Sequence, residues 1–317
     1  MAETPSLHSP WLVAVWPGMG HVALNAGYYL LSKLDMSFVA EFAPRELFEM
    51  EHVEVRNGVI ELGRLPQSRF FVWRDPEKVR DIVVFIGEAQ PAVGKYAFCS
   101  KLIEFARGLG VERVFTFAAM ATGMHPKKTP RTFGAATDEE GVEEIKRMEL
   151  EVLEDGHIGG LNGVLLGVAA EQGLRGSCLL GEVPQMFAQW PFPRAALAVL
   201  NAFTDMTGLA VDLSELEEQA EKVEDKLEEI LAQVGAAIEL AQEGMNKEYD
   251  DEEEESSFLP PEPEPHLDPE DEALIERLFE QAKVDRAKAY ELKTELDRLE
   301  VFKEYEDRFL DMFKRPE

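Results

Sequence analysis

Short, uninterrupted runs of apolar and β-branched residues alternate with longer apolar or amphipathic segments over the first 210 residues. The short runs are typical of strands buried on both faces of a sheet, and the longer segments have the period of helices. We therefore predict an α/β fold in which helices cover a mixed, mainly parallel sheet. The predicted strands are LVAVW from 12, SFVAEF from 37, RFFVW from 69, DIVVFIGE from 81, ERVFTFAAMATG from 112 and SCLLGEVP from 177.

The predicted helices lie between these strands. Asp138 precedes one of them and is a residue type that caps helix N-termini, whereas Gly110 ends another. This alternation of strands and helices indicates a three-layer α/β/α sandwich over residues 1–211. The helices are expected at 21–34, 94–110, from 138 onward, 157–176 and 194–208.

One segment predicts antiparallel pairing. Asn57-Gly58 separates VEVR from VIELG, and both residues of this pair tolerate a positive φ. We therefore expect a two-residue β-hairpin, which would make the sheet mixed.

The chain changes character after Asp212. Apolar residues then recur at alternating spacings of three and four, which predicts a helix over 212–247 with an a/d seam of the coiled-coil type. The seam can dock on the first domain or pair with a second copy of the chain. Its proposed oligomer or partner contacts are Leu213, Leu216, Val223, Leu227, Ile230 and Val234.

The last part of the chain divides into a linker and a helical segment. Residues 248–266 combine an acidic run with four prolines in six residues, a composition that predicts an extended, solvated linker. Residues 267–317 contain one predicted amphipathic helix, from Pro269 to Lys314, whose apolar seam is interrupted at Asp285. A lone helix is marginal in water, so we expect its aromatic end to be buried somewhere.

The net charge of −30 is concentrated at the C-terminal end, because residues from Asp212 onward contain 36 acidic and 13 basic side chains. Such a field repels phosphate backbones and anionic lipids, so we expect no nucleic-acid or membrane partner. The N-terminal MAETPSLHSP lacks the basic and apolar regions of a signal peptide, and no apolar run is long enough to span a membrane. These features predict a cytoplasmic protein.

Candidate ligand-binding residues lie at turns and strand ends. Gly18, Gly20 and His21 form a Gly-x-Gly turn that opens a helix, which could present backbone N–H groups to an anion. The turn lacks the third glycine of a dinucleotide site and the Lys-Ser/Thr of a P-loop, so we interpret it mainly as a structural turn. Glu88 and Gln90 follow a strand, at the edge where open α/β sheets keep their ligand clefts.

A third candidate region is the loop MATGMHPKKTPRTFG, in which His125 accompanies basic residues that could hold a carboxylate or an acidic partner. Cys99 and Cys178 have apolar neighbours and are expected to be buried free thiols. No catalytic triad, paired catalytic carboxylates or metal-ligand spacing is present, so we assign no catalytic residue, metal or cofactor.

Taken in order, several segments resemble the proteasome assembly chaperone 2 family and its prokaryotic homologues over about residues 10–235. The segments that carry this resemblance are GMGHVALNAGYYLLSKL, GEAQP, FTFAAMATG, GHIGGLNGVLLGVAAEQGLRGSCLLGEVP and PFPRAALAVLNAFTDMTGLAVDLSELEEQA.

The resemblance implies an α/β/α sandwich of phosphorylase/hydrolase-like architecture and a non-catalytic chaperone that binds proteasome α subunits. It also implies a C-terminal hydrophobic-Tyr-any tail, but here the sequence ends Phe-Lys-Arg-Pro-Glu, so tail-mediated docking is not expected. Our first hypothesis is a homo-oligomeric protein-interaction or assembly-chaperone protein. The alternative is an enzyme of nucleoside or carboxylate chemistry with a cleft at the carboxyl edge of the sheet.

Overall fold

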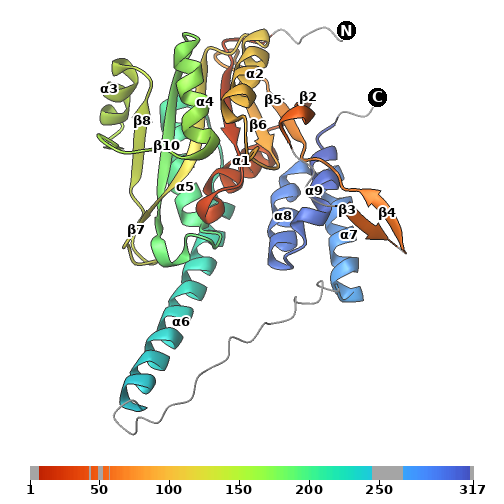
Figure 1. Cartoon of the computed structure of the whole chain (residues 1–317), viewed down its shortest axis with the longest axis vertical. Coiled ribbons are helices and arrows are strands. Elements are labelled where there is room, and N and C mark those ends of the chain that lie inside the picture. Colours follow the sequence, from red (N-terminus) through yellow and green to blue (C-terminus); the bar gives the residue numbers. More distant parts are fainter. Residues whose placement is uncertain (1–6, 43, 49–52, 57, 245–266, 315–317) are drawn as a thin grey trace.

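The chain folds around one large sheet with helices on both faces (Figure 1). The computed structural model describes residues 7–42, 44–48, 53–56, 58–244 and 267–314. The strands of the large sheet are β1 (Trp11–Val15), β2 (Ser37–Phe42), β5 (Ser68–Trp73), β6 (Ile82–Gly87), β7 (Arg113–Thr122), β8 (Thr132–Ala136), β9 (Glu151–Val152) and β10 (Arg175–Pro184). Their order in space is β2-β5-β6-β1-β7-β10-β8-β9.

The sheet is mixed and mainly parallel, as predicted. β6, β1, β7 and β10 run parallel to one another at its centre, whereas β5 is antiparallel to β6 and β8 is antiparallel to β10. The predicted hairpin also forms, from β3 (Val53–Arg56) and β4 (Val59–Leu62), with Arg56 opposite Val59. The prediction that this hairpin makes the main sheet mixed is wrong, because in the described residues β3 and β4 form a separate two-stranded sheet.

Both faces of the central strands are buried under helices. In β1, Trp11, Val13 and Val15 belong to one apolar cluster, and Leu12 and Ala14 belong to the other. The first cluster includes α1 (Val22–Lys33) and α5 (Pro193–Thr207), and the second includes α2 (Lys95–Gly108) and α4 (Gly160–Glu171). The three-layer arrangement thus follows from a strand with no polar face.

Small residues let α5 approach β10 closely. A Cβ atom on Gly181 would lie 2.6 Å from the backbone oxygen of Ala195, so only glycine fits at this point of β10.

The predicted N-cap also forms, since Asp138 accepts a hydrogen bond of 2.7 Å from the backbone N–H of Gly141 in α3 (Glu139–Arg147).

The seam helix α6 (Ser214–Gly244) docks its first half on the chain's own core. Leu216 and Leu227 are buried, and Leu213, Val223 and Ile230 pack against the same cluster. Arg194 of α5 and Glu224 of α6 form a two-fold ion pair, with both N···O distances 2.8 Å. Farther along, Val234 is 45% exposed, and α6 extends beyond the sheet (Figure 1).

The single helix expected from Pro269 to Lys314 is wrong, because this segment forms α7 (Pro269–Val284), α8 (Ala289–Arg298) and α9 (Phe302–Asp311). The first break is at Asp285, whose extended backbone ends α7 and whose carboxylate caps the following turn at Ala287. The second break includes Glu300, with a φ of 59°.

The proposed linker, 248–266, lies outside the described residues. Among the residues that are described, no helix has the length and apolarity needed to cross a bilayer.

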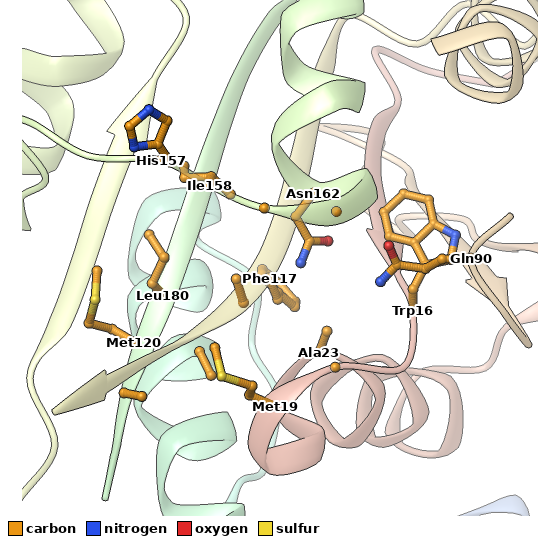
Figure 2. Close-up of a pocket in the computed structure, with 16 residues that line it drawn as sticks. Trp16, Met19, Ala23, Gln90, Phe117, Met120, His157, Ile158, Asn162 and Leu180 are labelled. Atoms are coloured by element: carbon orange, nitrogen blue, oxygen red, sulfur yellow. The ribbon is translucent and has the colours of Figure 1, made fainter. Parts of the chain in front are cut away.

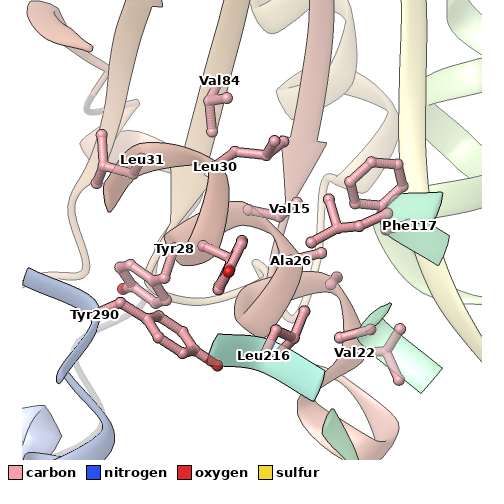
Figure 3. Packing of buried hydrophobic residues seen from close by; sticks show 14 of the residues in the cluster. Val15, Val22, Ala26, Tyr28, Leu30, Leu31, Val84, Phe117, Leu216 and Tyr290 are labelled. Carbon is pink, nitrogen blue, oxygen red and sulfur yellow. The ribbon is translucent and has the colours of Figure 1, made fainter. Parts of the chain in front are cut away.

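The aromatic end of the C-terminal segment is buried, as expected, and the helices that contact α1 are α8 and α9. Tyr28 makes edge contacts with Phe302 and Phe309 at centroid distances of 5.1 and 5.8 Å, and its hydroxyl donates a 2.6 Å hydrogen bond to Glu306. Tyr290 of α8 and Leu216 of α6 lie against the same helix (Figure 3). One continuous core therefore joins the sheet, α6 and the C-terminal helices.

Truncation of this contact should destabilise the whole fold. We expect Phe309→Ala to lower the free energy of unfolding by about 3–5 kcal/mol, because the fully buried ring leaves a cavity. Chemical denaturation followed by fluorescence measures this change. Val284→Ala is the control, since Val284 is 90% exposed and should matter little. Equal stability of Phe309→Ala and the wild type would show that α7–α9 do not unfold with the sheet.

Candidate functional site

A pocket of about 460 Å³ opens where the central parallel strands end (Figure 2). Its walls come from the segment after β1, the second half of β7 and the start of α4. Open α/β sheets commonly bind ligands at this edge. We call this site the carboxyl-edge pocket.

The lining of the carboxyl-edge pocket is mainly apolar. Met19, Phe117, Met120 and Leu180 contribute large side chains, and a run of alanines in β7 leaves the space between them. The side chains of the lining that carry polar atoms are those of Trp16, Gln90, His157 and Asn162, and the lining contains no Asp, Glu, Lys or Arg. The pocket therefore offers hydrogen bonds without a formal counter-charge.

Gln90 lines the pocket and connects two of its walls. Its side-chain oxygen accepts a 3.0 Å hydrogen bond from the backbone N–H of Leu161 in α4. Its Nε2 donates a 3.1 Å hydrogen bond to the backbone oxygen of Pro17, just after β1. Gln90 thus occupies the predicted edge and fixes the first turn of α4 there.

The Gly-x-Gly turn has two different roles in the structure. Gly20 adopts a φ of 61°, which glycine tolerates best, and its backbone bonds to Ala188 and Phe192 at 2.7 and 2.9 Å. Gly18 has an extended backbone and lines the pocket. His21 is exposed and is not part of the lining. Desolvation, and secondarily the charge of Lys293, lowers the pKa of His21.

Glu88 lies apart from the pocket, although the sequence grouped it with Gln90. Its buried carboxylate accepts hydrogen bonds from Arg64 at 3.0 Å and from the backbone of Gln67 at 2.9 Å. Arg69 lies 3.5 Å from the same carboxylate and 2.5 Å from Asp307 of α9. Burial raises the pKa of Glu88. The strand end that carries Glu88 is thus connected to the C-terminal helices.

His125 is also outside the pocket lining. It is exposed in the loop between β7 and β8, where its Nδ1 accepts a 3.2 Å hydrogen bond from the backbone N–H of Lys127. The Lys127 side chain pairs with Asp225 and Glu228 of α6. The basic loop therefore binds carboxylates of its own chain.

Of the site candidates named from the sequence, only Gly18 and Gln90 line the pocket, and Met19, His157 and Asn162 are among the lining residues that were missed. His157 begins the helix expected at 157–176, and Asn162 lies inside its apolar pattern with no motif around it. An asparagine in the first turn of a Gly-opened helix at the carboxyl edge is the signal that could have found the site.

Neither cysteine is an activated nucleophile, and the described side chains contain no metal cluster. Cys99 and Cys178 are buried free thiols, as expected, and burial raises the pKa of each to about 12. A thiol with such a pKa is not a thiolate at neutral pH. No group of three His, Cys, Asp or Glu side chains in the described ranges could hold a metal ion.

The β3–β4 hairpin provides a second candidate surface, of a different kind. The pairs Val53 with Leu62 and Val55 with Ile60 place four aliphatic residues on one side of the hairpin. The exposed fraction is 47% for Val53, 65% for Val55, 70% for Ile60 and 78% for Leu62. The hairpin extends outward from the rest of the molecule (Figure 1). We call this surface the hairpin face.

Comparison with known proteins identifies the family. The profile of the PAC2 family matches residues 12–231. The chain belongs to the PAC2 family. The resemblance seen in the sequence to proteasome assembly chaperone homologues is thereby confirmed.

Several relatives share both sequence and fold with this PAC2 protein. It is 27% identical over 232 residues to the uncharacterized protein MJ1210 of Methanocaldococcus jannaschii, covering 71% of this chain and 84% of MJ1210. The crystal structure of Pyrococcus furiosus PbaB, described as an archaeal proteasome activator, has a TM-score of 0.61 at 29% identity, covering 72% of this chain and 96% of PbaB. P. furiosus PbaA, described as an archaeal homolog of proteasome-assembly chaperone, has a TM-score of 0.56 at 25% identity, covering 76% and 95%.

The Leu-Leu-Gly-Glu segment, which contributes to the PAC2 resemblance, forms a buried ion pair in the structure. The Glu182 carboxylate accepts hydrogen bonds from the Arg131 guanidinium at 2.6 and 3.0 Å and from the Thr122 hydroxyl at 2.7 Å. These bonds, above all those from the Arg131 side chain, lower the pKa of Glu182 to about 2. Glu182 thus fixes the loop between β7 and β8 to the end of β10.

This ion pair should make the stability of the PAC2 protein sensitive to acid. A lowered folded-state pKa stabilises the fold above the ordinary carboxylate pKa, and the stabilisation is lost as the pH falls toward 2. Between pH 5 and pH 3 we expect the free energy of unfolding to fall by about 2 kcal/mol more in the wild type than in Glu182→Gln.

Denaturant titrations at both pH values measure this difference. Glu151→Gln is the matched control, because Glu151 contacts the same arginine but its side chain is 47% exposed. If Glu182→Gln and the wild type lost stability in parallel, the stabilising role of the ion pair would be refuted.

Proposed function

We propose that this PAC2 protein is a non-catalytic interaction protein that assists proteasome assembly or activity, and that the hairpin face contacts its partner. Its relatives PbaB and PbaA are described by their relation to the proteasome. Proteasome α subunits or their precursors are the proposed partners.

The observation that carries this proposal is the exposure of the hairpin face. An isolated two-stranded hairpin is at best marginally stable in water, and here its four aliphatic side chains remain largely exposed. Complete burial of such a side chain contributes about 1.5–3 kcal/mol. A partner that covers the hairpin face would therefore gain affinity and would also stabilise the hairpin.

The chemistry of the pocket gives less support to the alternative of an enzyme for carboxylate substrates. A buried carboxylate is bound most strongly by a paired cation, and the pocket lining contains no Lys or Arg. The described cysteines are not activated either. Protein recognition is therefore better supported than catalysis.

Self-association is a further part of the proposal. The first half of the α6 seam is occupied by the chain's own core, so Leu216 and Leu227 are not accessible to a second copy. Val234 is accessible, and so is the hairpin face. These two surfaces are the ones that support homo-oligomer formation.

Affinity capture of the full chain from its native cell lysate tests the proposal. We expect the wild type to retain proteasome α subunits or their precursors, identified by mass spectrometry, and Ile60→Glu/Leu62→Glu to lose them by about tenfold or more. The loss is expected because two charges would be placed in the centre of the apolar contact.

Val284→Glu is the matched control, because it places a charge on an exposed valine far from the hairpin in sequence and should retain the wild-type partners. Light scattering of the same samples measures the oligomer. Absence of proteasome subunits from the wild-type capture would overturn the proteasome assignment, and equal capture by the hairpin variant would exclude the hairpin face.

A further inference from the structure

The carboxyl-edge pocket contains a polar atom that the fold leaves without a partner. The side-chain oxygen of Asn162 is buried and receives no hydrogen bond from the described residues. Buried polar atoms are normally paired, so an unpaired acceptor in a pocket wall has an unused capacity for a hydrogen bond. The backbone around it is fixed, since the Thr116 hydroxyl donates a 3.3 Å hydrogen bond to the Asn162 backbone oxygen.

The geometry of this polar group suits a planar ligand. The Asn162 amide points from α4 into the pocket, opposite Met19 and near the apolar side chain of Phe117 (Figure 2). An asparagine amide presents an acceptor and a donor side by side, which matches another planar group with an adjacent donor and acceptor. The nearby Gln90 amide already uses its oxygen and one N–H group to connect the pocket walls.

The absence of counter-charges defines the class of ligand further. An ionised carboxylate, phosphate or amine would lose its hydration in the pocket and find no opposite charge in the lining. Large apolar groups surround the remaining space, so the rest of the ligand should be apolar.

We propose that the carboxyl-edge pocket binds a neutral, planar small molecule whose apolar body packs against Phe117, Met120 and Leu180. An N–H donor and an adjacent acceptor of the ligand pair with the Asn162 amide. Carboxamides and nucleobases share this chemistry. The inference does not depend on proteasome binding, because it rests on the pocket alone.

Calorimetric titration of the full-length protein tests the inference with three probes. Nicotinamide carries a carboxamide, adenine carries a nucleobase edge, and benzoate is a charged molecule of similar size. We expect at least one of the neutral probes to bind with a Kd of about 1 mM or tighter, a modest affinity for so few atoms. Benzoate should bind at least about tenfold more weakly, because its charge is not compensated. Tighter binding of nicotinamide would indicate a carboxamide ligand, and tighter binding of adenine would indicate a nucleobase ligand.

Two variants connect the binding to the pocket. Asn162→Leu keeps the approximate size of the side chain but removes the amide, and should weaken the neutral probe about tenfold or more. Asn201→Leu is the matched control, because Asn201 is exposed on α5 and does not line the pocket.

Gly18→Leu should block the pocket. The backbone of Gly18 is extended, and no atom lies within 4 Å of where its Cβ would be, so the substitution is compatible with folding. We expect it to abolish binding while the circular dichroism spectrum is unchanged. The inference is overturned if neither neutral probe binds the wild type, if benzoate binds equally well, or if Asn162→Leu binds like the wild type.

Discussion

Burial of the central parallel strands on both faces is the constraint on which the rest of the structure depends. β1 has no polar side, so helices must cover both faces, and each must be reached by a crossover connection. The carboxyl ends of these strands then meet at one edge. The carboxyl-edge pocket lies where β1 ends and β7 continues, beneath the first turn of α4.

The C-terminal helices extend one of the two cores and change the chemistry of the neighbouring strand end. Tyr28 of α1 contacts α9, while Arg69 of β5 pairs with Asp307. Glu88 lies at the centre of the same network, so it stabilises this contact and does not face the pocket. Charge at the edge is thereby paired within the chain, and the pocket lining contains no Asp, Glu, Lys or Arg. The same core includes the first half of α6, which makes the seam mainly an intramolecular contact.

The two candidate surfaces differ in their physical character and therefore in the partners they suit. The hairpin face is exposed and aliphatic and lies outside the main core, which is typical of a contact with a protein. The carboxyl-edge pocket is concave, mainly apolar and equipped with two amides, which is typical of a small-molecule site. A PAC2 protein with both surfaces could bind a protein and a small molecule without competition between them.

The sequence by itself determined the α/β class, the positions of six strands of the large sheet, the Asn-Gly hairpin, the Asp138 cap and the family, because these follow from local residue patterns. The short strands β8 and β9 at one side of the sheet were not predicted. It also identified Gln90 and Gly18, since both lie at strand ends. Only the tertiary structure decided that Glu88 is linked through Arg69 to Asp307 of α9, that the C-terminal segment forms three helices, and that Asn162 points into a pocket. Each of these depends on contacts between residues far apart in the chain. Local periodicity carries no information about which distant side chain will provide the opposing charge or leave the open space.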